Sequence, residues 1–147
     1  MQTTNKALMP NTDIFVRVSL ASDSDAIEKH LQLARAEASQ YRGAGTQSPE
    51  QGVLSLSYVA GVGETVMASL SASGSKETTV FIHHVFVIPE AREIGLGDAL
   101  VLQLLDDLRE LGVAHVSAHA LPGDRAMKNL FERHGLVAQT IIVGKSL

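Results

Sequence analysis

The feature that most constrains the fold is an apolar run that passes through a proline and two glycines into a helix. The run "TTVFIHHVFVI", residues 78–88, is almost continuously apolar, which is typical of a central strand buried on both faces. After Gly97 the period becomes helical, with one leucine stripe formed by Leu100, Leu104, Leu108 and Leu111. A buried strand followed at once by an amphipathic helix predicts a sheet covered by helices.

Alternation and turn residues predict the order of the other elements. Residues 54–58 and 66–70 alternate between apolar and small side chains and are bounded by glycine-rich turns, so with residues 78–88 they predict an antiparallel meander. Further strands are expected at 14–20, 113–121 and 136–144, and further helices at 22–41 and 122–135. The later strand–helix–strand unit requires a parallel pair. The expected fold class is therefore α/β in the α+β sense, with a mixed, mostly antiparallel central sheet flanked by helices.

Length, charge and composition narrow the function classes. The 147 residues suit one domain over 14–147, after a flexible lead-in at 1–13. A net charge of −4 lacks the basic excess of a nucleic-acid binder, and no apolar run is long enough to span a membrane. The absence of cysteine excludes disulfides, thiolate metal ligands and cysteine-linked intermediates. We expect a cytoplasmic protein that binds neither nucleic acid nor membrane.

The turn between the buried strand and the helix has the residues of an anion site. The first N–H groups of a helix lack intrahelical partners, and Gly95 and Gly97 remove side chains that would keep an anion from them. Arg92 adds a forked cation suited to phosphate oxygens. The pattern indicates a phosphate or pyrophosphate site, although the same glycines could serve only a tight turn. The dinucleotide fingerprint needs glycine where Leu100 stands, and the P-loop needs a G-K-[ST] that is missing.

Two segments together resemble the signatures of one enzyme family. The stretch "VFVIPEAREIGLG" contains R-x-x-G-x-G and resembles the acyl-CoA-binding segment of the Gcn5-related N-acetyltransferases (GNAT). Downstream, "ALPGDRAMKNLFERHGL", residues 120–136, is similar to the second signature of that family, especially in bacterial protein-lysine acetyltransferases. The element order resembles that of the GNAT fold over residues 14–143.

The resemblance implies which residues would hold acetyl-CoA, as co-substrate and without a metal. The pantetheine arm would pair with the backbone of Val85, Phe86 and Val87, where a backbone N–H would also stabilise the oxyanion. The pyrophosphate would be held by Arg92 and by the backbone of Glu93, Ile94, Gly95, Leu96, Gly97 and Asp98. We expect the Asp98 carboxylate itself to turn to solvent, away from the phosphate. Asp124 stands where the family often has an asparagine that contacts the pantetheine.

Two histidines are the candidates for removing the proton of an acceptor amine. Where the family commonly has a glutamate, this chain has His83 and His84, and imidazole can act as the base. Alternation puts them on opposite faces unless a bulge intervenes, so no shared metal ion is expected, and His83 is preferred. Either histidine could instead be a buried structural group.

The main departure from the family pattern concerns the leaving thiolate. The family often has a tyrosine there as general acid, and this chain has Phe131, which carries no transferable proton. The thiolate of coenzyme A would then take its proton from solvent, His134 or Ser117. Alternatively it would need no proton to leave, since a thiolate whose thiol has a pKa near 8.5 is a reasonably good leaving group.

The expected function is direct transfer of an acetyl group from acetyl-CoA to a primary amine in a ternary complex. The acceptor is left open between a small amine and a protein lysine or N-terminus, and the polar loop at residues 43–52 is expected to help select it. The alternative is a non-catalytic acyl-CoA-binding sensor or regulatory module of the same fold. The apolar segment "TIIVG" near the C-terminus would suit the interface of a homodimer.

Overall fold

The computed structural model describes residues 13–147, so the expected lead-in lies outside the described residues except for Asp13. The strands are β1 (Ile14–Val18), β2 (Leu54–Val62), β3 (Thr65–Gly74), β4 (Val80–Val87) and β5 (Val116–Ala118). The helices are α1 (Ser24–Ala38), α2 (Leu96–Leu111) and α3 (Arg125–Arg133), with short 3-10 turns η2 (Ala21–Asp23) and η3 (Pro89–Ala91). Within the described residues, no helix has both the length and the apolar character needed to cross a membrane.

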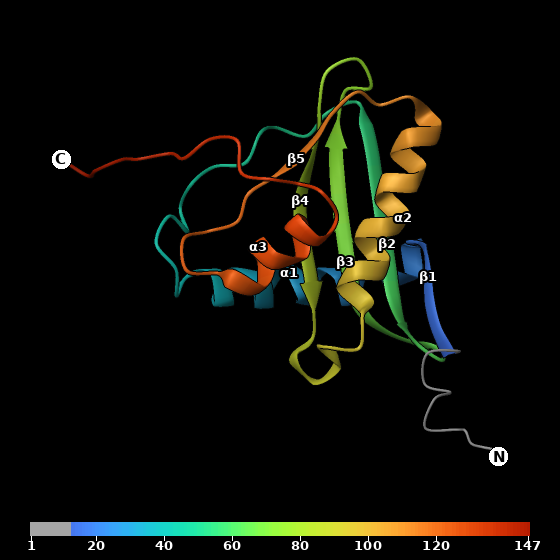
Figure 1. Cartoon of the computed structure of the whole chain (residues 1–147). Helices are drawn as coiled ribbons and strands as arrows, with labels where there is room; N and C mark the ends of the chain where they lie inside the picture. The colour runs from blue at the N-terminus through green and yellow to red at the C-terminus, as the bar shows by residue number, and fades with distance from the viewer. Residues whose placement is uncertain (1–12) are drawn as a thin grey trace.

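The strands form one sheet in the order β1-β2-β3-β4-β5 (Figure 1). β1 to β4 pair antiparallel with their neighbours, and β5 pairs parallel with β4. α1 lies across one face of β3 and β4, whereas α2 packs on the other face over β1 to β4. The expected mixed, mostly antiparallel sheet flanked by helices is confirmed.

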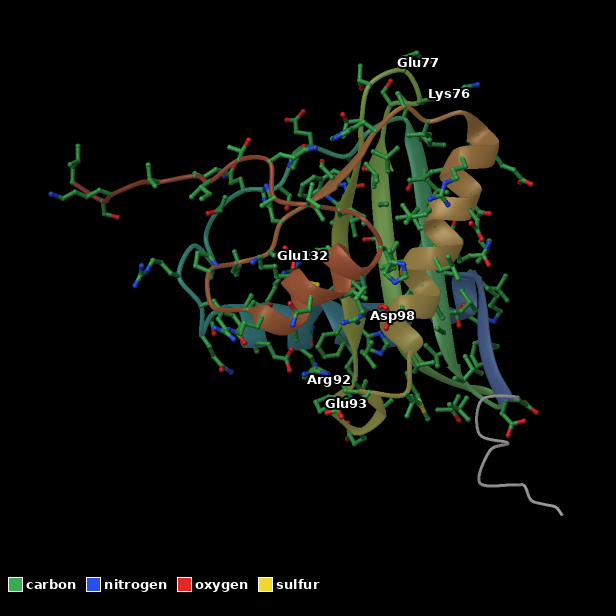
Figure 2. All side chains as sticks on the ribbon, in the orientation of Figure 1. Lys76, Glu77, Arg92, Glu93, Asp98 and Glu132 are labelled. Carbon is green, nitrogen blue, oxygen red and sulfur yellow. The ribbon has the colours of Figure 1, made fainter. Side chains whose placement is uncertain are left out.

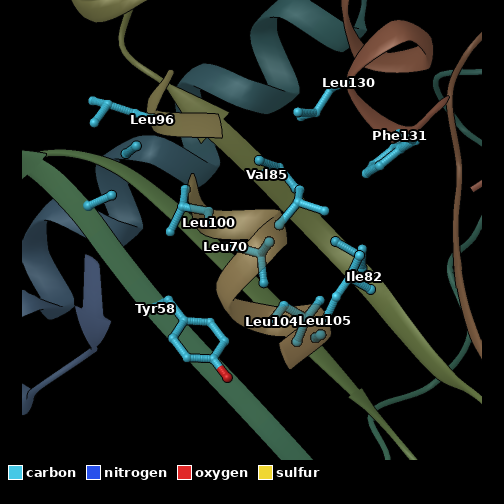
Figure 3. Packing of buried hydrophobic residues seen from close by; sticks show 14 of the residues in the cluster. Tyr58, Leu70, Ile82, Val85, Leu96, Leu100, Leu104, Leu105, Leu130 and Phe131 are labelled. Carbon is cyan, nitrogen blue, oxygen red and sulfur yellow. The ribbon is translucent and has the colours of Figure 1, made fainter. Parts of the chain in front are cut away.

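The sheet face under α2 carries the main apolar core. Tyr58, Leu70 and Val85 lie opposite one another on β2, β3 and β4, and each is at most 6% exposed. Leucines of α2, together with Leu130 and Phe131 of α3, complete this cluster (Figure 3). Burying one large apolar side chain stabilises a fold by roughly 1.5–3 kcal/mol. We therefore place the main stabilisation of the fold on this face.

The sheet face under α1 is buried but carries several polar side chains, unlike the apolar face under α2. Between the core positions of β3 lie Ser69, Ser71 and Ser73, and the first and last of these are at most 1% exposed. His30 of α1 is 3% exposed and packs against Phe86 of β4, with 5.5 Å between ring centroids. Buried polar groups need hydrogen-bond partners. Here the serines and histidines of adjacent elements supply them for one another.

Three details of the elements differ from expectation. β3 continues to Gly74, beyond the residues 66–70 that alternation predicts, because its serines pair with residues of β2 and β4. β5 is only three residues long. The strand expected at 136–144 does not form, and Ile141, Ile142 and Val143 are 68–87% exposed. An apolar, β-branched segment becomes a strand only where another strand hydrogen-bonds to it, and no described strand pairs with this one.

Candidate active site

The edge of β4 that faces β5 is open along most of its length. The parallel pairing covers only residues 80–82 of β4. From residue 84 to 87, β4 has a strand partner on the β3 side alone, within the described part of the chain. Unpaired N–H and C=O groups along a strand can bind an extended ligand as an added strand. The residues expected to pair with a pantetheine arm lie in this opening: Val85, Phe86 and Val87.

A β-bulge lies at the start of this opening. In the register with β3, Ser71 is opposite His84 and Ala72 is opposite Ile82, so His83 is an extra residue without a partner. Both histidines reach the α1 face, because His83 Nε2 is 2.7 Å from one serine of β3 and His84 is within 3.0 Å of two others. The bulge is the exception that the sequence analysis allowed for: it adds one residue to the alternation, so the two histidines share a face.

Both ring nitrogens of His84 have protein partners. Nδ1 is 2.9 Å from Ser71 Oγ, and Nε2 is 3.0 Å from Ser69 Oγ, which is also 2.8 Å from His30 Nδ1. Burial, with smaller contributions from His30 and His83, lowers the pKa of His84 to about 4. His84 is therefore neutral at pH 7. A ligand can reach its ring nitrogens only by displacing a serine or through a serine hydroxyl.

His83 keeps one ring nitrogen open. Its Nε2 has a hydrogen-bond partner, Ser73, whereas no described residue hydrogen-bonds to its Nδ1. Burial lowers the pKa of His83 too, although the ring is only partly buried. A neutral imidazole with an open nitrogen can accept a proton from an amine.

His30 and the serine row of β3 are the polar residues of this site that sequence reasoning missed. His30 follows Ile27 by three residues, a spacing that puts both on one helix face, so the signal was present. The serine row is visible as strict alternation over residues 68–73. Its burial could not be foreseen from β3 alone, because it depends on α1 covering that face.

The turn between β4 and α2 is held in left-handed backbone conformations. Glu93 has a φ of 72° and Gly95 a φ of 93°. Such geometry is unfavourable for a residue with a Cβ, and it recurs at ligand-binding turns. A Cβ on Gly95 would meet nothing within 4 Å, whereas one on Gly97 would lie 3.5 Å from Leu130 of α3. Gly95 thus permits the turn, and the N-terminus of α2 begins without a side-chain cap, as an anion site requires.

Arg92 is bound by the protein itself. Its Nε donates to Val87 O at 2.8 Å, and a terminal nitrogen donates to the two oxygens of Glu37 at 3.0 and 2.8 Å. Its guanidinium also lies 5.3 Å from the centroid of the Phe86 ring. Arg92 therefore links the C-terminal end of α1 to the turn that follows β4 (Figure 2). To bind a pyrophosphate, it would exchange Glu37 for phosphate oxygens.

The Asp98 side chain is 40% exposed, as expected of a residue that faces solvent, but its carboxylate also binds two residues at the end of α3. Arg133 donates from two nitrogens to its carboxylate oxygens, each at 3.0 Å, and His134 Nε2 lies 2.8 Å from one of them. Hydrogen bonds from Arg133 first, and from His134, hold the pKa of Asp98 below its usual value. The carboxylate ties the first turn of α2 to the C-terminal end of α3 (Figure 2). Its charge is balanced there by a guanidinium.

The α3 residues named by the family resemblance have structural contacts. Asp124 is the N-cap of α3, and its Oδ1 accepts the Met127 N–H at 3.1 Å. Phe131 is 6% exposed and lies in the apolar core (Figure 3). Asp124 thus organises the start of the helix, and Phe131 supports its packing on the sheet.

A concave surface also occurs away from these residues. A cavity of about 320 Å³ lies between β2 and the C-terminal half of α2, and its lining contains none of the predicted site residues. Across residues 13–147, no cluster of three or more histidine, aspartate or glutamate side chains is arranged to hold a metal ion. The candidate site is an open strand edge that leads to an uncapped helix start.

Comparison with known proteins places this arrangement in a family. Residues 25–136 match the model of a family described as "Acetyltransferase (GNAT) family". The chain belongs to the GNAT family. The matched range contains every candidate site residue from β4 to α3. In a sequence search of curated proteins, nothing matches the chain.

Solved structures share the GNAT fold at low sequence identity. An aminoglycoside acetyltransferase from an uncultured soil metagenomic sample has a TM-score of 0.70 and 13% identity, over 93% of this chain and 97% of that chain. A ribosomal-protein-alanine N-acetyltransferase from Brucella melitensis biovar Abortus 2308 has a TM-score of 0.65 and 13% identity, over 91% and 99%. At such identities the likeness shows the fold alone. The narrower similarity to protein-lysine acetyltransferases stays a prediction.

Proposed function

We propose that this GNAT protein transfers an acetyl group from acetyl-CoA to a primary amine, directly within a ternary complex. The supporting observation is that the open edge of β4 and the bulge at His83 occur in the same segment. Open backbone groups suit the amides of a pantetheine arm. The bulge adds an imidazole with an open nitrogen beside them. Membership of the GNAT family makes acetyl transfer the chemistry to test.

The residues proposed to hold acetyl-CoA follow β4 into α2. The backbone of Val85, Phe86 and Val87 would pair with the pantetheine arm, and the N–H groups from Glu93 to Asp98 would receive the pyrophosphate. The positive end of the α2 dipole favours an anion there, and the open space at Gly95 admits one. Bound acetyl-CoA supplies the activated thioester, and the role of this chain is to align it.

A primary ammonium acceptor loses two protons in the transfer: one leaves to free the lone pair that attacks, and the second goes to solvent as the amide forms. The amine nitrogen attacks the thioester carbonyl carbon, the C–N bond forms, and the C–S bond breaks with its electron pair on sulfur. We assign His83 Nδ1 as the group that takes the first of these protons, because both nitrogens of His84 have serine partners. A backbone N–H of β4 would stabilise the oxyanion. Because Phe131 carries no proton to give, the thiolate leaves unassisted or takes a proton from solvent.

The acceptor is proposed only as a class. The two solved neighbours are named for acceptors as different as an aminoglycoside and a ribosomal-protein alanine. A small amine, a protein lysine and a protein N-terminus all present the nucleophile that this chemistry needs. The panel used to test the function should contain all three.

Turnover of acetyl-CoA with a panel of amines, followed by release of free thiol, tests the proposal. We expect thiol release that depends on an amine. His83→Gln should lower kcat by about a hundredfold or more, the usual contribution of a general base, with little change in the KM for acetyl-CoA. His84→Gln is the matched variant, and its effect should be smaller. Equal activity of wild type and His83→Gln would remove His83 from the chemistry.

The second candidate is a non-catalytic acyl-CoA-binding module, which the lack of a hydroxyl at Phe131 favours. A thermal-shift titration separates it from the enzyme, because a ligand at a hundred times its Kd stabilises a fold by about 2.7 kcal/mol. Stabilisation by acetyl-CoA without turnover of any amine would favour the module. No stabilisation and no turnover would overturn both.

A further inference from the structure

Ser73 links His83 to the loop between α1 and β2. Ser73 is 1% exposed, and its Oγ lies 2.7 Å from His83 Nε2. The same oxygen accepts the N–H of Gly52 at 3.1 Å. A buried hydroxyl with a partner on each side has little freedom to rotate. One side chain therefore meets both the end of the loop and the ring of His83.

The contact with the loop depends on a close approach of two glycines. A Cβ on Gly52 would lie 2.5 Å from the backbone of Gly74, nearer than real Cβ contacts come. Only glycine lets the loop end approach β3 this closely. This approach brings the Gly52 N–H within reach of Ser73.

The start of the loop rests on the connection between β5 and α3. A Cβ on Gly43 would be 3.7 Å from Leu121, and one on Gly123 would be 3.5 Å from the ring of Tyr41. The loop at residues 39–53 therefore runs from the β5–α3 connection to β3, on the side where β4 and β5 separate (Figure 1). A ligand that approaches His83 from that side meets the loop.

His83 is also held by an aromatic neighbour. The ring of Phe81 meets it edge-on, with 5.3 Å between centroids, and Phe81 in turn packs 4.8 Å from the ring of His119. These contacts limit tilting of the imidazole, and the hydrogen bond to Ser73 sets which nitrogen points inward. The open nitrogen, Nδ1, is thereby aimed by its surroundings.

We propose that Ser73 is the positioning residue of His83 and couples the ring to the loop at residues 39–53. An acceptor bound against this loop then controls how His83 is presented to the amine. The inference rests on the proposed function, in which His83 takes the acceptor proton. Ser73 acts through His83 and touches neither acetyl-CoA nor the acceptor.

Steady-state kinetics of Ser73 variants test the coupling. Ser73→Ala should lower kcat by roughly tenfold to a hundredfold, the usual loss when a reacting group is misplaced. The KM for acetyl-CoA should change less than about twofold, because the β4 edge and the start of α2 are untouched. Ser73→Thr keeps the hydroxyl and should restore kcat. Ser57→Ala, on the same sheet face opposite Ser71, is the control and should keep the wild-type kcat.

An unchanged kcat in Ser73→Ala overturns the proposal. A fall in kcat that Ser73→Thr does not restore, at wild-type thermal stability, overturns it as well. If instead the KM for acetyl-CoA rises while kcat is kept, Ser73 supports binding and not His83, which is also contrary to the proposal.

Nuclear magnetic resonance supplies a readout that does not depend on turnover. In Ser73→Ala the Gly52 amide should exchange faster with solvent, and the ring signals of His83 should shift. If these spectral changes are seen but the wild-type protein acetylates no amine, the proposed function is overturned and the link between Ser73 and His83 stands. Unchanged His83 signals and an unchanged Gly52 exchange rate would overturn the link itself, whatever the activity.

Discussion

Successive residues of β3 face two chemically different surfaces. Ala68, Leu70 and Ala72 point to α2 and are at most 1% exposed within the apolar core. The serines that alternate with them, Ser69, Ser71 and Ser73, point to α1, where they hold His30, His83 and His84 by hydrogen bonds. The α2 face stabilises the fold by burial, whereas the α1 face buries polar groups whose net contribution is small. A single strand can thus serve stability on one face and chemistry on the other.

The largest expected effect belongs to the α2 face. Leu100 is fully buried, so Leu100→Ala should lower the free energy of unfolding by about 2–5 kcal/mol through lost burial and a cavity. Urea denaturation measures this loss. Leu102 lies on the same helix and is 52% exposed, so Leu102→Ala should change stability by less than about 0.5 kcal/mol. Similar losses in the two variants would contradict the assignment of the core to this face.

The next effect is a pH dependence of stability that comes from the α1 face. Burial lowers the pKa of His84 from 6.5 to about 4, so between these values the unfolded chain binds more protons than the native one. Stability should therefore be full above pH 6.5 and fall as the pH drops toward 4. The loss is at most about 3.5 kcal/mol, since the two pKa values differ by about 2.5 and one pKa unit corresponds to about 1.4 kcal/mol. The pKa values of His30 and His83 are lowered too, chiefly by burial, and they act in the same direction.

Thermal unfolding at pH 7 and pH 5 checks this dependence. Gln in His84→Gln cannot be protonated, so this variant should lose less stability than the wild type between pH 7 and pH 5, with His30 and His83 supplying the remaining slope. Leu102→Ala, which changes no titrating group, should keep the wild-type slope. A wild-type profile that is flat from pH 7 to 4.5 would show that the α1 face opens to water and is not a buried polar layer.

The smallest effect concerns the ion pair between Glu37 and Arg92, which joins α1 to the turn after β4. Both side chains are about 40% exposed, so Glu37→Gln should cost less than about 1 kcal/mol. The difference should shrink in 1 M salt, which screens exposed charges. Asp106→Asn, which breaks the exposed pair with Arg109, is the comparison. If Glu37→Gln lowers the free energy of unfolding much more than Asp106→Asn does, Arg92 also stabilises the α1 face through its contact with Phe86.

Local patterns were enough to predict most of the fold. Alternation, glycine turns and the leucine stripe located β1 to β4, α2 and α3, and the motif spacing placed the turn at Gly95 at a helix start. The strand expected at 136–144 failed because strand formation depends on a distant partner, which a local pattern does not reveal. Leu111, the last residue of the predicted stripe, is 41% exposed because α2 ends there.

The site was less predictable, because its contacts join residues far apart in the chain. Arg92 and Asp98 were expected to face phosphate and solvent, and both are bound by charged residues of other helices, Glu37 and Arg133. Neither pair leaves a signal in one sequence, since the partners are 55 and 35 positions away. The bulge at His83 could not be predicted from the sequence either, because it depends on the register between β3 and β4.

The bulge makes His83 an insertion that can be separated from the rest of its strand. β4 has eight residues, of which seven are matched with β3. Without His83 its sequence would read "VFIHVFV", which alternates without a break and keeps each remaining side chain on its present face. Deleting one codon should thus leave an uninterrupted ladder and remove an imidazole. The architecture can gain or lose this group without rebuilding its core.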